Sequence, residues 1–180
     1  MRKWNGILTA AIFVLFLLHA ILGGFQLLGV GSTALKSVAW VSVGLIAVHT
    51  VIGCKLTADT LRVWKRTGVG YFRENKLFWA RRLSGFAVMV LLVFHLTAFF
   101  SSGAGGGYRL PWFNGFRLAA QLLLVAAIAV HVISNVRPML ITLGIRSLRQ
   151  WVGDILLVLA ALLLFMAAAF IVYYLRWNVW

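Results

Sequence analysis

The stretch that decides the fold begins with a basic segment and continues into a long apolar run that carries His95. It reads Tyr71-Phe72-Arg73-Glu74-Asn75-Lys76-Leu77-Phe78-Trp79-Ala80-Arg81-Arg82-Leu83-Ser84-Gly85-Phe86. Lys and Arg that flank an apolar segment are retained on the cytoplasmic side of a membrane. The stretch therefore predicts a transmembrane helix with a basic cytoplasmic end. An ionisable ring inside such a helix indicates function, and three other apolar runs also carry one histidine each.

The composition predicts a membrane protein along the whole chain. Of its 180 residues, 63% are hydrophobic and 11% are charged, and the mean hydropathy is +0.98, which excludes an ordinary soluble domain. Since a helix needs about 20 apolar residues to cross a bilayer, we expect an all-α integral membrane protein. The expected fold is a five-helix transmembrane bundle that forms a single transmembrane domain over residues 1–180. The predicted spans are about 6–30, 37–54, 83–101, 117–136 and 152–175.

Glycine and proline predict where the helices end. The sequence 29–33 predicts a tight turn, and the glycine-rich segment 101–111 predicts a flexible loop. The second helix is expected to continue through residues 55–66 as a cytoplasmic extension until Gly68 ends it. Pro138 predicts either a helix boundary or a kink, because proline disfavours helical geometry in the residue before it.

The basic residues predict the orientation of the chain. It has 17 Lys and Arg against 3 Asp and Glu, for a formal net charge of +14. Thirteen of the basic residues fall on one predicted side of the membrane and four fall on the other. The positive-inside rule then places the N-terminus in the cytoplasm and the C-terminus outside. We interpret the charge as a topology signal and as contact with anionic lipid, and not as nucleic-acid binding.

Two other features are predicted to be structural. The single cysteine, Cys54, excludes an internal disulfide and cannot form a zinc site alone. Aromatic residues near the C-terminus are typical of a belt at the membrane interface. They are Tyr173, Tyr174, Trp177 and Trp180.

The four histidines are predicted to sort into two layers. Because successive helices run in opposite directions, His19 and His95 are expected near the outer face, and His49 and His131 near the cytoplasmic face. At a rise of about 1.5 Å per residue, the layers would lie roughly 10–15 Å apart in depth. Two imidazoles from different helices can bind one haem iron from both sides. The sequence therefore predicts two haem b groups, an outer one bound by His19 and His95 and an inner one bound by His49 and His131.

A non-redox interpretation of the histidines stays open, since an intramembrane histidine often bonds a neighbouring helix. Asp, Glu and Lys are absent from the cores of the apolar runs, which argues against a proton relay or an ion path. Small residues at helical spacings from the histidines either give room to a macrocycle or simply let helices approach. They are Gly23, Gly24, Gly53, Ala98 and Ala127.

Two groups of residues match the pattern of a known family: Gly70-Tyr71-Phe72-Arg73-Glu74-Asn75 with Arg82-Leu83-Ser84-Gly85 and His95, and His131 with Asn135 and Leu143-Gly144-Ile145. They are similar to the third and fourth helices of dihaem cytochrome b membrane anchor subunits. These are the single-chain anchors of the succinate:quinone oxidoreductase and quinol:fumarate reductase family. The resemblance covers most of the chain and is strongest from 70 to 145. It includes the layout of five helices with a histidine on each of the first four.

The resemblance implies a function and a set of partners. The chain would pass electrons between membrane quinone or quinol, with menaquinone favoured, and a cytoplasmic pair of subunits that interconverts fumarate and succinate. That pair is an iron–sulfur subunit and a flavoprotein subunit, which alone carry the iron–sulfur clusters and the FAD. The chain would be the membrane subunit of an oxidoreductase complex in a bacterial or archaeal cytoplasmic membrane, without activity of its own toward the soluble substrate.

Further candidate contacts lie near the inner boundary. Arg81 and Arg82 are candidates for binding haem propionates or a partner subunit, and are equally explained as positive-inside anchors. Ser84, Trp79 and Tyr71 are candidates for quinone contact. For Ser84 the alternative is a bond to its own helix backbone, and for the two aromatic residues it is anchoring at the interface.

The sequence also differs from some relatives, because neither the turn at 29–36 nor the fourth span contains an acidic residue. A glutamate-dependent proton route is therefore not expected. One alternative function is a cytochrome b anchor of a different flavoprotein or dehydrogenase complex. Another is a non-redox membrane anchor.

Overall fold

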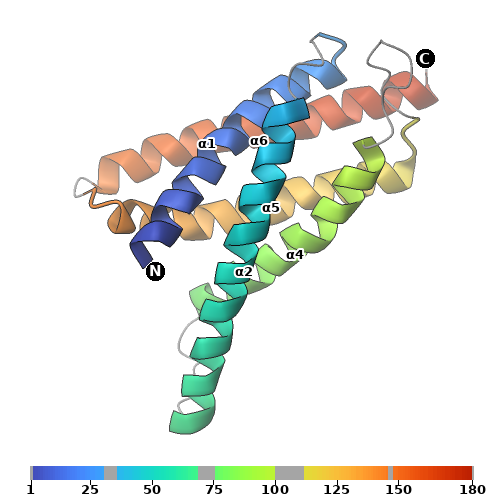
Figure 1. Ribbon diagram of the computed structural model, residues 1–180. Coiled ribbons are helices and arrows are strands. Elements are labelled where there is room, and N and C mark those ends of the chain that lie inside the picture. Colours follow the sequence, from blue (N-terminus) through green and yellow to red (C-terminus); the bar gives the residue numbers. More distant parts are fainter. Residues whose placement is uncertain (1, 31–35, 69–75, 100–111, 146–147, 180) are drawn as a thin grey trace.

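The described part of the chain is a bundle of five long helices (Figure 1). The computed structural model describes residues 2–30, 36–68, 76–99, 112–145 and 148–179. All five helices are long and apolar enough to cross a membrane, which confirms the predicted all-α class. The helices are α1 (Arg2–Leu27), α2 (Lys36–Thr67), α4 (Lys76–Phe99), α5 (Gly115–Thr142) and α6 (Leu148–Asn178).

Successive helices run in opposite directions (Figure 1). The most extensive packing is between α4 and α5; α5 also packs against α6, and α1 packs against both α2 and α6. In Figure 1, α2 crosses the bundle at a steep angle and its final turns extend beyond the other helices. Residues near the ends of α1 and α4 therefore share one end of the bundle, and those near the ends of α2 and α5 approach the other.

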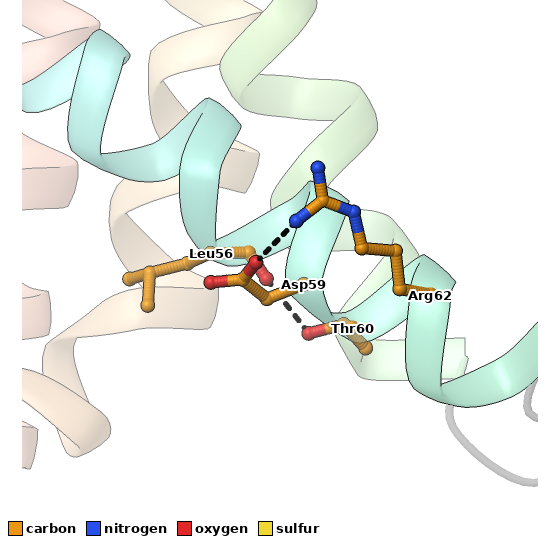
Figure 2. A network of polar contacts seen from close by, with 4 residues as sticks. All are labelled: Leu56, Asp59, Thr60 and Arg62. Atoms are coloured by element: carbon orange, nitrogen blue, oxygen red, sulfur yellow. Dashed lines mark hydrogen bonds and ion pairs between the residues drawn. The ribbon is translucent and has the colours of Figure 1, made fainter.

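The extension of α2 is a polar, exposed helix, as the sequence predicts. Arg62 Nη1 forms an ion pair with Asp59 Oδ1 at 3.3 Å, and Thr60 Oγ1 donates to the carbonyl of Leu56 at 2.8 Å (Figure 2). Both charged side chains are more than half exposed, so the ion pair contributes little to stability. The helix ends where Gly68 adopts a φ of +65°, which a residue without a Cβ tolerates best.

Two clusters of buried side chains form part of the core. One consists of Leu27, Phe113, Ala169, Phe170 and Tyr173 and joins α1, the segment before α5, and α6. The other consists of Val136, Met139 and Leu140 of α5. The predicted interfacial belt is wrong for Tyr173, which is only 2% exposed because its ring packs against Phe113 at 5.1 Å between centroids.

The outer surface of the bundle is apolar. Leu157 and Leu164 of α6 are each 72% exposed, and similar side chains cover the other helices. Soluble proteins rarely expose apolar surface so widely, so this surface fits a lipid environment. Trp177 is exposed at the end of α6, as an interfacial residue would be, whereas Trp180 lies outside the described residues.

Glycine ends α5 through paired hydrogen bonds. Gly144 has a φ of +81°, and its N–H donates to the carbonyl of Ile141 at 3.1 Å, while the N–H of Ile145 donates to that of Leu140 at 3.1 Å. These two bonds satisfy carbonyls that the helix itself leaves open. Gly29 ends α1 in the same way, with a φ of +92°. The rest of the predicted turn, residues 31–33, and the predicted loop at 101–111 lie outside the described residues.

Pro138 lies inside α5, so the prediction of a helix boundary at this position is wrong. Proline has no N–H, and the carbonyl of Ser134, four residues earlier, therefore lacks its helical donor. Arg81 of α4 replaces that donor, because its Nε–H bonds the Ser134 carbonyl at 2.8 Å. A membrane helix tolerates proline when a neighbouring helix satisfies the freed carbonyl.

The helices extend past the predicted spans mainly at the basic end. α4 begins at Lys76 instead of residue 83, and α5 continues to Thr142 instead of 136. Lys and Arg are good helix formers, so a charge can end the membrane-embedded stretch without ending the helix. The side of the membrane on which each terminus lies, and the assignment of 1–180 to a single domain, stay predictions.

Gly24 of α1 gives a prediction about this packing. A Cβ at Gly24 would lie 2.8 Å from Cζ of Phe165 on α6. Gly24→Ala is expected to lower the free energy of unfolding by about 1–3 kcal/mol, because the ring must move. The matched control is Gly44→Ala in α2, where a Cβ would meet no atom within 4 Å. This control should be neutral or stabilising by up to about 1 kcal/mol, since alanine is the better helix former. Denaturant unfolding in detergent measures both changes, and equal stability of the two variants would contradict this packing.

Candidate functional site

His19 of α1 and His95 of α4 lie against each other. Their ring centroids are 6.0 Å apart and their ring planes are 80° apart. Two imidazoles that bind one metal ion from opposite sides have centroids about 6 Å apart, because each metal–nitrogen bond is about 2.0–2.1 Å long. The structure thus brings the two residues of the predicted outer site to a separation that suits axial ligands.

Gln121 of α5 fixes the ring of His95. Its side chain is completely buried, and its Oε1 lies 2.7 Å from Nδ1 of His95. An amide oxygen only accepts hydrogen bonds, so Nδ1 of His95 carries a proton, and in the neutral ring Nε2 then keeps a free lone pair. Phe99, one turn further along α4, packs on the same imidazole at 5.1 Å between centroids. His95 is therefore held as a neutral imidazole with one nitrogen able to bind a metal.

The sequence analysis missed Gln121. An available signal was the amide itself, an uncharged polar side chain within an apolar span that has to find a partner. Its Nε2 is buried and makes no hydrogen bond within the described part of the chain. That donor remains open to a water molecule or a bound group.

His131 of α5 is held from α4. Its Nδ1 lies 3.3 Å from Ser84 Oγ, and Ser84 Oγ donates to the carbonyl of Arg81 at 3.2 Å. The arrangement is satisfied when Nδ1–H of His131 donates to Ser84 Oγ, which again leaves Nε2 unprotonated. A Cβ at Gly85 would lie only 3.0 Å from Cε1 of His131, so glycine gives this imidazole its room. The sequence analysis did not identify this role of Gly85.

His49 of α2 lies close enough to His131 for the two rings to interact electrostatically, and Arg82 of α4 interacts with both. The Nδ1 atom of His49 is buried and has no hydrogen-bond partner among the described residues. An unmatched buried nitrogen is costly and indicates a missing water or ligand. Both residues of the predicted inner site thus lie within electrostatic range of Arg82, and a nitrogen of His49 has no partner among the described residues.

The two arginines of α4 have different surroundings. Arg81 uses Nε for the carbonyl that Pro138 frees on α5, as described above. Arg82 points toward α2, where its Nη1 lies 3.5 Å from the carbonyl of Gly53, and its guanidinium lies 5.1 Å from the ring centroid of Phe78. Of the two guanidinium groups, that of Arg82 is the one that interacts electrostatically with both inner histidines.

The remaining predicted residues are less informative. Ser84 bonds its own helix backbone, which is the alternative that the sequence left open, and also contacts His131. Trp79 is half-buried on α4, where its ring packs against Phe78 at 5.4 Å between centroids. Tyr71 lies outside the described residues.

The small glycines near the histidines differ in whether space is open beside them. A Cβ added to Gly24 would overlap the ring of Phe165, so this glycine allows α1 and α6 to pack closely. Nothing lies within 4 Å of the corresponding position at Gly23, one turn after His19, and at Gly53 the nearest atom is Arg82 Nη1 at 4.0 Å. Space beside the histidines is thus available at Gly23 and Gly53.

The candidate ligands in this site are two predicted pairs of histidine imidazoles. Within the described residues, no three His, Cys, Asp or Glu side chains gather to hold a metal ion. A protein-only zinc site would need three or four such ligands. Two imidazoles from different helices would be sufficient ligands if a porphyrin supplied the other four nitrogens.

A scan against protein-family models gave no match for this chain, and neither did searches of curated proteins and of solved structures.

Proposed function

We propose that this multi-pass membrane protein is a dihaem cytochrome b anchor. It would pass electrons between membrane quinone or quinol and a cytoplasmic iron–sulfur and flavoprotein pair that interconverts fumarate and succinate. The observation that carries the proposal is the arrangement of the histidines. They come from the first four helices in two pairs, and each pair joins helices that alternate along the chain.

Support for an outer haem comes from His19, His95 and Gln121. The centroid separation of 6.0 Å suits two ligands of one iron, and the bond from Nδ1 of His95 to Gln121 directs Nε2 to the metal. Metal-binding histidines usually donate their second nitrogen to an oxygen in this way, because the bond fixes the tautomer and raises the basicity of the ligand. Gly23 leaves open space one turn after His19.

Support for an inner haem comes from the other pair. Ser84 orients His131 as Gln121 orients His95, and His49 lies within electrostatic range of His131. Arg82, which interacts with both rings, is positioned to bind a propionate by charge-assisted hydrogen bonds. α2 packs mainly against α1, and it reaches α4 through single contacts such as Thr50 Oγ1 to Met89 Sδ at 3.0 Å. Looser packing of this kind suits an inserted macrocycle.

In this proposal the protein holds and tunes its cofactors. Haem supplies a reversible one-electron iron couple. The histidines bind the iron, Gln121 and Ser84 set the tautomers of their neighbours, and the apolar helices exclude water. Two parts of the proposal rest on the family resemblance: the use of a quinone and the identities of the soluble partners. The proposed quinone contacts are Ser84, Trp79 and Tyr71.

One alternative function has an observation in its favour. The bond between His95 and Gln121 also satisfies both side chains as a simple contact between helices. A non-redox anchor would use the histidines in this way and would carry no haem.

The first test is the visible spectrum of the purified protein. We expect reduced-minus-oxidised α and Soret bands and about two haems per chain in the pyridine haemochrome assay. His19→Ala and His95→Ala should each lose the same haem, and His49→Ala and His131→Ala the other, as resolved by redox titration. Val48→Ala, a lipid-exposed neighbour of His49, is the control and should keep both.

A colourless wild-type protein would leave only the non-redox alternative. Loss of both haems from a single variant that keeps its helix content by circular dichroism would contradict the pairing.

Chains that copurify with the protein separate the two redox functions. An iron–sulfur protein and a flavoprotein that together reduce fumarate with a quinol analogue support the proposed complex, and other dehydrogenase subunits support a different one.

The second test concerns the hydrogen bond at His95. Gln121→Leu removes the acceptor, so His95 becomes a weaker donor to iron and the midpoint potential of the outer haem should rise. Gln121→Glu provides a stronger acceptor and should lower the midpoint potential of the outer haem. The leucine variant should also retain that haem about tenfold less tightly, as is typical when the partner of a ligand is lost.

Ser84→Ala is the matched control for Gln121, because its hydroxyl contacts His131 of the other pair. This variant should shift the midpoint potential of the inner haem and leave that of the outer haem unchanged. Shifts of the same sign in the leucine and glutamate variants would indicate general disruption and contradict a specific role for the hydrogen bond.

A further inference from the structure

A groove lies between α4 and α5 at the end of the bundle where Arg81, Arg82 and Arg137 are found. Its volume is about 620 Å³, which is within the range of pockets that hold small ligands. Its walls are mainly apolar, and Leu77, Val130, Ile133 and Ile141 contribute to them. These four side chains are each a little over half exposed, so the groove opens to the outer, apolar surface of the bundle and not to its interior.

Two arginines, Arg81 and Arg137, are among the residues that line this groove. The Nε of Arg81 is held at 2.8 Å by the carbonyl of Ser134, and that carbonyl is available because Pro138 has no N–H to give it. Within the described part of the chain, this bond leaves both terminal nitrogens of Arg81 for another partner. A lysine could not bond a carbonyl and keep a planar pair of donors free.

Arg137 is exposed and has no acidic partner, since the ion pair between Arg62 and Asp59 is the only one in the described part of the chain. It lies five residues before the end of α5, which is about 8 Å along the helix. Val130 lies about 10 Å deeper, by the same rise. The groove therefore has cationic groups near the membrane boundary and an apolar track that continues toward the middle of the span.

We propose that this groove binds one anionic phospholipid, with the phosphate on Arg81 and Arg137 and an acyl chain along Val130 and Ile133. A guanidinium group near hydrocarbon is stabilised by an anion or by backbone carbonyls, and the chain has 17 basic but only 3 acidic residues to supply an anion. Guanidinium groups bind phosphate oxygens in a bidentate manner. Basic pockets between transmembrane helices are known to bind anionic headgroups. An uncharged quinone would leave Arg137 without a counter-ion.

This inference is independent of haem binding, and its test uses the complete, purified protein. The protein is reconstituted into nanodiscs of dioleoyl phosphatidylcholine with increasing dioleoyl phosphatidylglycerol. Bound lipid is counted by native mass spectrometry, and the thermal midpoint is measured in parallel. We expect phosphatidylglycerol, but not additional phosphatidylcholine, to bind one per chain and to raise the midpoint.

Two pairs of variants separate the groove from general surface charge. Arg137→Gln should weaken binding of phosphatidylglycerol about fivefold, the usual effect of one basic residue. Arg66 is an exposed arginine on the extension of α2, and Arg66→Gln should leave binding of phosphatidylglycerol unchanged. Ile133→Trp fills the apolar track and should also weaken binding. Leu157→Trp, on the exposed face of α6, should not.

The inference is overturned by any of three results: equal binding of the two lipids, equal loss in Arg137→Gln and Arg66→Gln, or unchanged binding in Ile133→Trp. Displacement of phosphatidylglycerol by a quinone analogue whose own affinity survives Arg137→Gln would also overturn it, because the groove would then be a quinone site.

Discussion

The structure depends on one constraint: a polar atom inside the apolar part of the bundle must find a partner within the protein. The chain has few polar groups with which to meet it, because only 11% of its residues are charged. The Ser134 carbonyl that Pro138 leaves open is therefore satisfied from another helix, by Arg81. The same constraint joins His95 to Gln121 and His131 to Ser84. Each of these bonds crosses between α4 and α5, the two helices that pack most extensively.

The constraint also decides the chemical state of the histidines. A buried imidazole that donates from Nδ1 keeps its lone pair on Nε2, and this is the form that binds metal. α4 and α5 thus prepare one ring in each pair, while α1 and α2 contribute the second ring, His19 or His49. The partners differ in strength, since a fully buried amide oxygen at 2.7 Å is a better acceptor than a hydroxyl at 3.3 Å. In the proposed cytochrome, this difference would help to give its two haems different potentials.

Pro138 connects the interior of the bundle with its surface. By leaving the Ser134 carbonyl without a helical donor, it draws the Arg81 side chain across to α5, beside Arg137 and the apolar groove that opens to lipid. One backbone defect therefore stabilises the contact between α4 and α5 and places a cation beside the exposed apolar groove. The basic residues that predict the orientation of the chain are, in the proposed lipid site, also ligands for the bilayer.

The sequence by itself determined that the chain forms five long apolar helices, and that one histidine lies on each of the first four. Hydrophobic run length and basic flanks are local properties. Because alternate helices run in the same direction, the prediction that His19 pairs with His95 and His49 with His131 follows from the order of the helices along the chain. Only the tertiary structure decided that Gln121 bonds His95, that Gly85 makes room for His131, that Tyr173 is buried, and that α5 continues through Pro138. These outcomes depend on which faces of the helices meet and on side chains more than 25 residues apart, as with His95 and Gln121. Run length and residue order do not specify the rotation of each helix about its axis, and that rotation selects the partners.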